Sequence, residues 1–243
     1  MRRGKWGKLL IVGLVALLAT SVSASTVMTV TIESDFGGGR SWSAGYVGSS
    51  QGDGTLSFSG SNVSGWYDGW WEMEGKTNPQ LGGDYSVLNP ADVWQIFTVT
   101  FAIPIDSPIL PSTLVGGSVG GSVTDTNGDG VGGATTVEDS SLFEGLLDGN
   151  IAMSLYDHPQ SWPAAGSFAF GGQTVNILAV DAGLPGPTLP AGGVSNTIGI
   201  RNEFALAPGD SIAFTSFFQV VVPEPATALL LGTGLLALRR RRK

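Results

Sequence analysis

Short stretches of alternating hydrophobic and polar residues run through the middle of the chain, separated by glycine, proline, asparagine and aspartate. A period of two is typical of antiparallel strands with one buried face. In the clearest stretch, residues 211–222, one face would carry Ile212, Phe214, Ser216, Phe218, Val220 and Val222. Six further strands are expected at residues 26–33, 55–59, 93–103, 150–156, 174–181 and 198–206.

Seven or more strands between residues 25 and 222 predict an all-β domain, an antiparallel β-sandwich of jelly-roll type. Residues 140–147 leave two alternatives open. Their apolar side chains have helical spacing behind a capping box of Ser141 and Glu144, but so short a run is also compatible with a strand. Long loops are expected where glycine and proline interrupt the alternation, at residues 36–54, 75–89, 104–133 and 184–195.

The first twenty-four residues have the organisation of a secretory signal peptide. Basic residues at 1–8 precede an apolar run at 9–19, and small residues lead up to Ala24. The apolar run is short for a permanent membrane span. We therefore expect signal peptidase to cleave after Ala24; the alternative is an uncleaved N-terminal anchor.

The C-terminal tail combines two prolines, an apolar stretch and a basic end. Pro223, Glu224 and Pro225 should stop the preceding strand, because proline lacks a backbone donor. Residues 226–238 would form a hydrophobic, transmembrane-like helix about 20 Å long, and the basic cluster should stay cytoplasmic. That cluster consists of Arg239, Arg240, Arg241, Arg242 and Lys243. An exported chain would thus pause in the inner membrane, facing the periplasm.

In this order, the three parts resemble the PEP-CTERM sorting signal of Gram-negative bacteria, a tail also catalogued as an ice-binding protein C-terminal domain. The resemblance covers only the tail and the accompanying signal peptide; the body shows no regular threonine-rich ice-binding face. Together with the strand pattern, which alone describes the body, it divides the chain into a signal peptide (1–24), an extracellular β-sandwich domain (25–222) and a sorting signal (223–243). It further implies that an exosortase recognises the chain, processes it near the Pro-Glu-Pro segment and delivers it to the cell surface or a biofilm exopolysaccharide matrix.

Composition excludes several kinds of chemistry. Of the 243 residues 37 are glycine, one is histidine and none is cysteine. Disulfide scaffolds, thiolate metal sites and sites with two imidazoles are therefore absent. Nine of the twelve basic residues lie in the terminal segments, so residues 25–222 carry three basic residues against nineteen acidic ones, a net charge of −16. Such a surface repels nucleic acid, which we do not expect as a partner.

Residues 125–130, Asp-Thr-Asn-Gly-Asp-Gly, fit the first half of a calcium-binding loop. Oxygens of Asp125, Asn127, Asp129 and Val131 would occupy positions 1, 3, 5 and 7. Position 12 is Thr136 instead of a bidentate glutamate, so Ca²⁺ would bind weakly as a cofactor. The alternative is a hairpin turn without metal.

Residues 65–74 concentrate aromatic and acidic side chains. Trp66, Tyr67, Trp70 and Trp71 lie beside three carboxylates. Exposed aromatic rings next to carboxylates can stack on sugars and accept hydrogen bonds from hydroxyl groups. The simpler interpretation is that alternate rings of a strand enter the core while the others cover its edge.

Candidates for catalysis are few, and we expect no catalytic residues and no enzyme. Asp157 and His158 are neighbours on an extended chain, so their side chains should point apart. Glu72 and Glu74 would share a strand face about 7 Å apart, within the range of glycosidase carboxylate pairs. In so acidic a body, ordinary surface acids explain them more simply.

The sequence therefore predicts an exported cell-surface or matrix protein with a non-enzymatic structural or adhesive role. The alternative is a carbohydrate-binding module that contacts exopolysaccharide through the residue 65–74 aromatics, assisted by calcium. A third hypothesis, a glycoside hydrolase, requires two facing carboxylates in a cleft.

Overall fold

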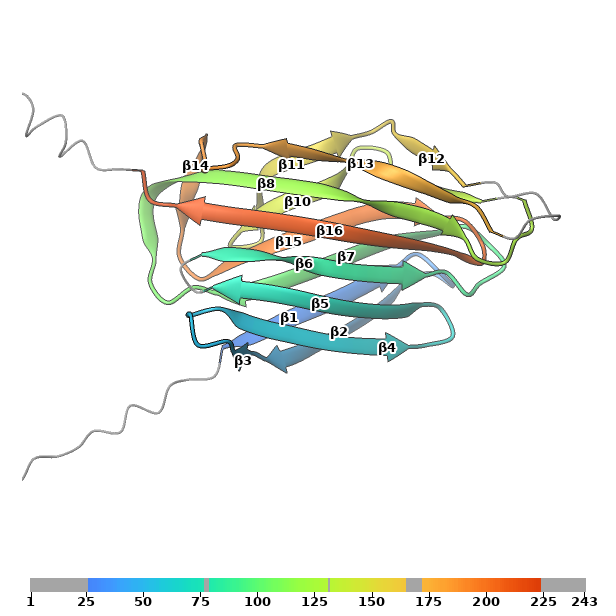
Figure 1. The fold of residues 1–243 in the computed structure, drawn as a ribbon, viewed down its shortest axis with the longest axis horizontal. Helices are drawn as coiled ribbons and strands as arrows, with labels where there is room; N and C mark the ends of the chain where they lie inside the picture. The colour runs from blue at the N-terminus through green and yellow to red at the C-terminus, as the bar shows by residue number, and fades with distance from the viewer. Residues whose placement is uncertain (1–25, 77–78, 131, 165–171, 224–243) are drawn as a thin grey trace, which may run out of the picture.

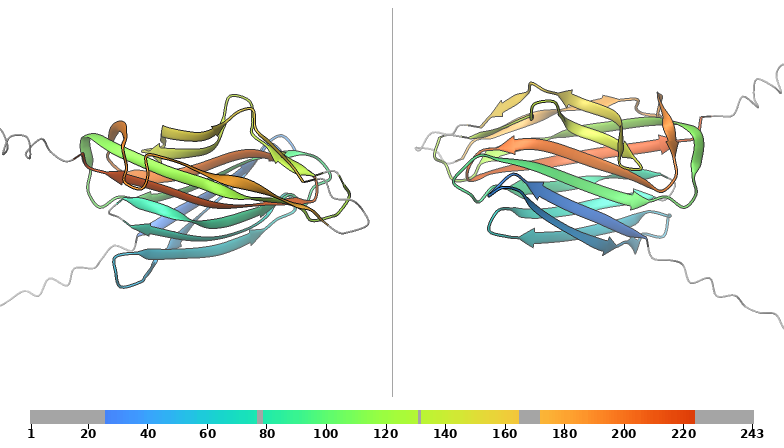
Figure 2. Two further views of the ribbon diagram at one scale, coloured as in Figure 1. Left: turned by 45° about the horizontal axis from the view of Figure 1, so that its top comes forward. Right: turned by 180° about the vertical axis from the view of Figure 1, so that it is seen from behind.

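A computed structural model describes residues 26–76, 79–130, 132–164 and 172–223. These residues form strands and loops and contain no α-helix, and hence no helix that could cross a membrane. The strands make two antiparallel sheets, which lie as two layers (Figures 1 and 2).

The first sheet contains β1 (Val27–Ser34), β2 (Arg40–Val47), β7 (Gln95–Pro104), β9 (Gly133–Thr135), β10 (Ser141–Leu147), β11 (Asn150–Asp157), β12 (Ser161–Pro163) and β15 (Thr197–Leu206). Its order is β11-β10-β15-β7-β1-β2, with β9 pairing β15 and β12. The second sheet contains β3 (Ser49–Ser50), β4 (Leu56–Val63), β5 (Asp68–Lys76), β6 (Gln80–Leu88), β8 (Ile109–Asp125), β13 (Thr174–Ala182), β14 (Leu189–Val194) and β16 (Asp210–Val221). Its order is β13-β8-β16-β6-β5-β4-β3, with β14 also pairing β8.

Alternation along each strand builds one hydrophobic core between the two sheets. Aromatic rings of opposite sheets meet there: the Tyr85 and Phe101 centroids are 5.1 Å apart, and those of Phe204 and Phe214 are 5.4 Å apart. The inward face of β16 is the predicted one, with Ile212, Phe214, Ser216, Phe218 and Val220 buried. Val222 is the exception, because it lies beyond the last paired residue and is 59% exposed.

The structure confirms the all-β class and the seven expected strands, with boundaries shifted by a few residues. The jelly-roll connection stays a prediction, and the expected signal peptide and C-terminal helix lie outside the described residues. Of the two alternatives for residues 140–147, the strand is correct. Strand β10 lies between β11 and β15 and all seven of its residues are buried, so both faces carry apolar side chains and the period of two disappears from the sequence.

The four expected loops are wrong in large part, because each contains at least one strand. Residues 36–54 include β2 and β3, and the other three loops include β6, β8 and β14 respectively. Several glycines in these strands mark close approach of a neighbour, not chain reversal. In β8, the longest strand, a Cβ at Gly121 would overlap the carbonyl oxygen of Ala213, and one at Gly120 would lie 3.0 Å from the Ala179 Cα.

Gly121→Ala should therefore destabilise the protein by about 2 kcal/mol, as overpacking does. The matched control is Gly192→Ala in β14, where a Cβ would have no neighbour within 4 Å. Urea unfolding of both variants checks the difference; equal loss of stability in both would contradict the packing role of Gly121.

Candidate functional site

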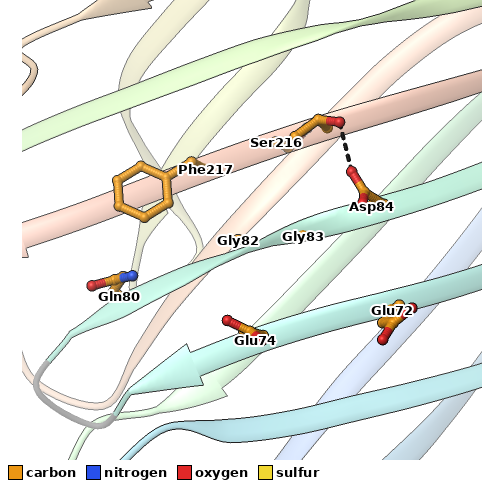
Figure 3. Close-up of a pocket in the computed structure, with 9 residues that line it drawn as sticks. Glu72, Glu74, Gln80, Gly82, Gly83, Asp84, Ser216 and Phe217 are labelled. Carbon is orange, nitrogen blue, oxygen red and sulfur yellow. Dashed lines mark hydrogen bonds between the residues drawn. The ribbon is translucent and has the colours of Figure 1, made fainter.

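A shallow groove of about 470 Å³ lies on the outer face of the second sheet, across β5, β6 and β16 (Figure 3). Residues of β5 alternate between the two faces of the sheet. Glu72 and Glu74 point outward, whereas Trp71 and Met73 are buried. The groove is lined by Glu72, Glu74, Gln80, Gly82, Gly83, Asp84, Thr215, Ser216 and Phe217. Three carboxylates thus face solvent from neighbouring strands.

Glycine forms the floor of this groove. A Cβ at Gly82 would lie 2.8 Å from the Phe217 ring. Gly83 has a φ of +150°, and a Cβ there would overlap the backbone of Glu72 and Met73. Larger residues at these two positions would fill the depression or displace β5. The groove is therefore a consequence of close strand packing.

The groove is strongly acidic. Glu72 and Asp84 are direct cross-strand partners, so their negative charges lie side by side. Asp84 accepts a 2.6 Å hydrogen bond from the Thr215 hydroxyl. All three carboxylates are exposed, whereas a glycosidase acid needs an environment that keeps its proton near neutral pH. The arrangement suits hydrogen bonding to hydroxyl groups or binding of cations.

The aromatic residues predicted as a patch are divided between core and surface. Tyr67 and Trp71 are buried, and the Trp71 ring packs against Trp42 at 5.6 Å and Tyr46 at 5.2 Å. Trp66 is half-buried against Tyr67. Trp70 is 47% exposed and borders a second depression next to Asp84 and Thr215. The four aromatic residues therefore do not form one exposed surface, and that interpretation is wrong. Alternate rings enter the core, and Trp70 is the exposed ring on the same sheet face as the groove.

The predicted calcium residues lie at the end of β8. Asp125 is buried and accepts a 2.6 Å hydrogen bond from the Gly128 N–H, while Asn127 and Asp129 are exposed. The Asn127 amide donates to Asp129 at 3.0 Å. Val131 lies outside the described residues. Thr136, at position 12, accepts from the Gln160 N–H at 2.8 Å and is thus engaged elsewhere.

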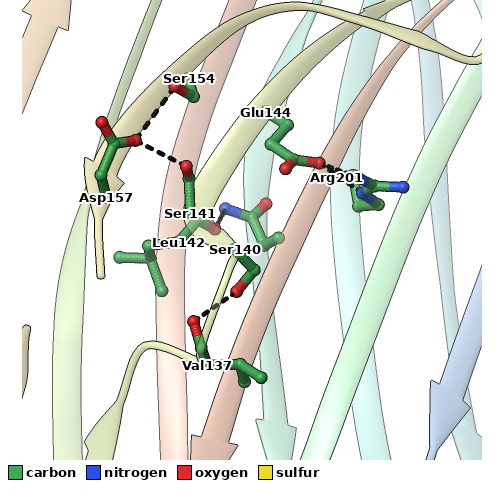
Figure 4. A network of polar contacts seen from close by, with 9 residues as sticks. Val137, Ser140, Ser141, Leu142, Glu144, Ser154, Asp157 and Arg201 are labelled. Carbon is green, nitrogen blue, oxygen red and sulfur yellow. Dashed lines mark hydrogen bonds and ion pairs between the residues drawn. The ribbon is translucent and has the colours of Figure 1, made fainter. Parts of the chain in front are cut away.

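A polar network joins β10, β11 and β15 (Figure 4). Asp157 accepts hydrogen bonds from Ser141 at 2.6 Å and Ser154 at 3.0 Å. His158 instead faces Thr136, with its Nδ1 3.2 Å from the Thr136 Oγ1. Asp157 and His158 therefore have different partners, as extended chain geometry predicts.

In the same network Glu144 is buried and forms an ion pair with Arg201. Burial raises the pKa of Glu144, and the nearby Glu203 and Asp157 add to this, against the opposing effect of Arg201. The carboxyl group thus holds its proton more tightly in the folded protein than in the unfolded chain.

Of the nine residues that line the groove, sequence reasoning proposed only Glu72 and Glu74 for a site and missed, among others, three polar side chains. Gln80 and Asp84 lie in a strand that was expected to be a loop, and Thr215 comes from a strand far along the chain. Period-two alternation in β6, with Leu81, Tyr85 and Val87 buried, was a signal that could have found the first two.

Beyond the groove, β16 ends at Val221 at one end of the molecule (Figure 1), two residues before Pro223. Residues 221–243 match the family model described as the PEP-CTERM protein-sorting motif. The C-terminal tail is a PEP-CTERM sorting signal. Such a signal implies a secreted protein that is processed by an exosortase. A comparison with curated proteins gave no match.

The PEP-CTERM signal begins where the sheet stops. The Val221 residue is still paired with Leu114, Val222 is exposed, and Pro223 cannot donate to a further strand. Glu224, Pro225 and the terminal arginines lie outside the described residues. In the sequence, the first proline of the Pro-Glu-Pro segment is therefore only two residues from the last paired residue of the β domain.

The raised pKa of Glu144 predicts a pH effect. The folded state binds the proton more tightly than the unfolded chain. The stability that the protonated Glu144 contributes is therefore lost as the pH rises above 4.5, the ordinary pKa of a glutamate, and through the raised pKa of the folded state. Urea unfolding of the wild type and Glu144→Gln at pH 4 and pH 7 checks this. The wild type should lose stability relative to the variant at pH 7; a difference independent of pH would contradict it.

Proposed function

We propose that this chain is a cell-surface or extracellular-matrix protein whose β domain has a non-enzymatic structural or adhesive role. The observation that carries the proposal is the PEP-CTERM signal placed directly after β16. Processing there would release the whole β domain, because the last paired residue precedes the two prolines. Signal peptidase would act at the other terminus, after Ala24.

The proposed route to the surface passes through the inner membrane. The apolar segment 226–238 would hold the chain there transiently, with the domain facing the periplasm and the arginines in the cytoplasm. The strongly acidic domain would then be released into an environment of polysaccharide and divalent cations. Its acidity favours solubility and disfavours binding to anionic membranes.

Replacing both Pro223 and Pro225 by alanine should leave export intact but leave the tail uncleaved. The expected result on a blot of cell fractions is a larger form retained in the membrane fraction. Replacing Pro187 and Pro190, which lie in the loop before β14 and in β14 itself, is the control and should not change processing. A mature form of normal size from the Pro223/Pro225 variant would contradict the proposed site.

A second candidate function, binding of polysaccharide, is favoured by the groove. Trp70 offers an aromatic face beside the outward carboxylates Glu72 and Asp84 and the Thr215 hydroxyl, and sugars bind to such combinations. The ligand would lie across β5, β6 and β16 as an extended chain. Exopolysaccharide from the producing cell is the proposed partner.

Trp70→Ala should weaken binding to that exopolysaccharide about five-fold, the equivalent of roughly 1 kcal/mol for one stacked ring. Affinity gel electrophoresis of the secreted protein measures the effect. Trp94→Ala is a matched control, because Trp94 is also 47% exposed but lines neither the groove nor the second depression that Trp70 borders. Equal retardation of the wild type, Trp70→Ala and Trp94→Ala in the polysaccharide gel would argue against the groove as a glycan site.

A further inference from the structure

Two buried aspartates meet where β8 ends and β16 begins. Asp125 and Asp210 are direct cross-strand partners, and neither side chain is exposed to solvent. They continue the inward-facing rows of the two strands, directly after Val123 and before Ile212. The hydrophobic core therefore ends in a pair of carboxylates.

The Asp210 carboxylate is incompletely satisfied. Its Oδ2 accepts a 2.5 Å hydrogen bond from the Gly133 N–H, whereas its Oδ1 is buried and has no hydrogen-bond partner. A buried carboxylate oxygen without a partner destabilises the folded state, because it has lost its hydrogen bonds to water and forms none in the protein. The oxygen marks a place where a ligand is expected.

No basic side chain of the described residues neutralises Asp210. Arg201 pairs with Glu144, Lys76 pairs with Asp53, and Arg40 lies at the start of β2 in the other sheet. The buried Asp210 carboxylate therefore has no counter-ion among these residues.

The acidic loop after β8 is held against the turn before β16. The Thr126 hydroxyl donates to the Gly209 carbonyl, and the Asn127 amide donates to the Pro208 carbonyl at 3.2 Å. Gly132 closes the site from the other side, because a Cβ there would lie 2.7 Å from Asp210 Oδ2. Oxygen atoms of two distant chain segments are thereby brought together.

We propose that Asp210 replaces the missing position-12 glutamate, so that the Asp125 and Asp210 carboxylates bind one Ca²⁺ ion. Among the described residues no three acidic, histidine or cysteine side chains are arranged to hold a metal by themselves. The remaining ligands are therefore oxygens of the residue 126–130 loop and water, which Ca²⁺ accepts in flexible geometry. Mg²⁺ is disfavoured because it requires a near-ideal octahedron.

The bound ion would connect β8 to the first residue of β16, at the end of the molecule opposite the last residue of β16 (Figure 1). Strand β16 has 12 residues, so its two ends are about 36 Å apart. A chain without cysteine has no disulfide with which to make such a cross-link. The site is separate from the groove and does not depend on glycan binding.

The test is calorimetric titration and thermal unfolding of the secreted protein after removal of metal with EGTA, using CaCl₂ as the probe and MgCl₂ for comparison. One Ca²⁺ per chain should bind, and the melting temperature should rise by about 3 °C at ten times the dissociation constant. Asp210→Asn should weaken Ca²⁺ binding at least about ten-fold. It retains an oxygen acceptor for Gly133 and should fold without metal.

Asp181→Asn on β13 is the matched control, because it removes an exposed carboxylate elsewhere and should bind Ca²⁺ like the wild type. If Asp210→Asn does not fold, Asp129→Asn replaces it: the side chain is exposed, and loss of its charge should also weaken binding. Absence of Ca²⁺ binding by the wild type up to about 10 mM would overturn the proposal. Unchanged Ca²⁺ affinity in folded Asp210→Asn would overturn it equally.

Discussion

The two sheets approach each other so closely that large side chains of one sheet lie over glycines of the other. Phe218 of β16 occupies the space where Gly145 of β10 would carry a Cβ. In the opposite direction, a Cβ at Gly117 of β8 would lie 3.1 Å from Phe143 and Met153. Interiors are packed at crystal-like density, so at these points a large side chain fits only because the facing residue is glycine. The hydrophobic core between the two sheets depends on this close fit.

Polar groups gather where this core ends. Asn89 is fully buried beside the turn before β16, and its amide donates to the carbonyls of Val93, Leu206 and Ala207. The N–H of Asn89 donates to the Asp210 carbonyl at 2.9 Å. Asn89 thus ties the segment before β7 and the end of β15 to the first residue of β16. Within this bonded region the Asp210 Oδ1 is buried without a partner.

The proposed activities lie on different parts of one rigid framework. The sorting signal leaves from the end of β16, the acidic groove lies across the outer face of the second sheet, and the aspartate pair is at the start of β16. Such separation would allow a tail to be processed without disturbing a ligand on the sheet face. It also means that an ion at the far end would act on stability and not on sorting.

The sequence by itself determined the β class, the inward face of β16 and the identity of the sorting tail, because period two and the order of prolines, apolar residues and arginines are local properties. It could not separate strand glycines from loop glycines, so β6 and β8 were missed. It left open whether the rings of residues 65–74 form one surface or alternate between core and edge, and the structure shows alternation, with Trp71 buried and Trp70 exposed. Only the tertiary structure brought Asp84 beside Thr215 and Asp125 beside Asp210. Contacts between residues 85 or more positions apart depend on strand register, which no local pattern contains.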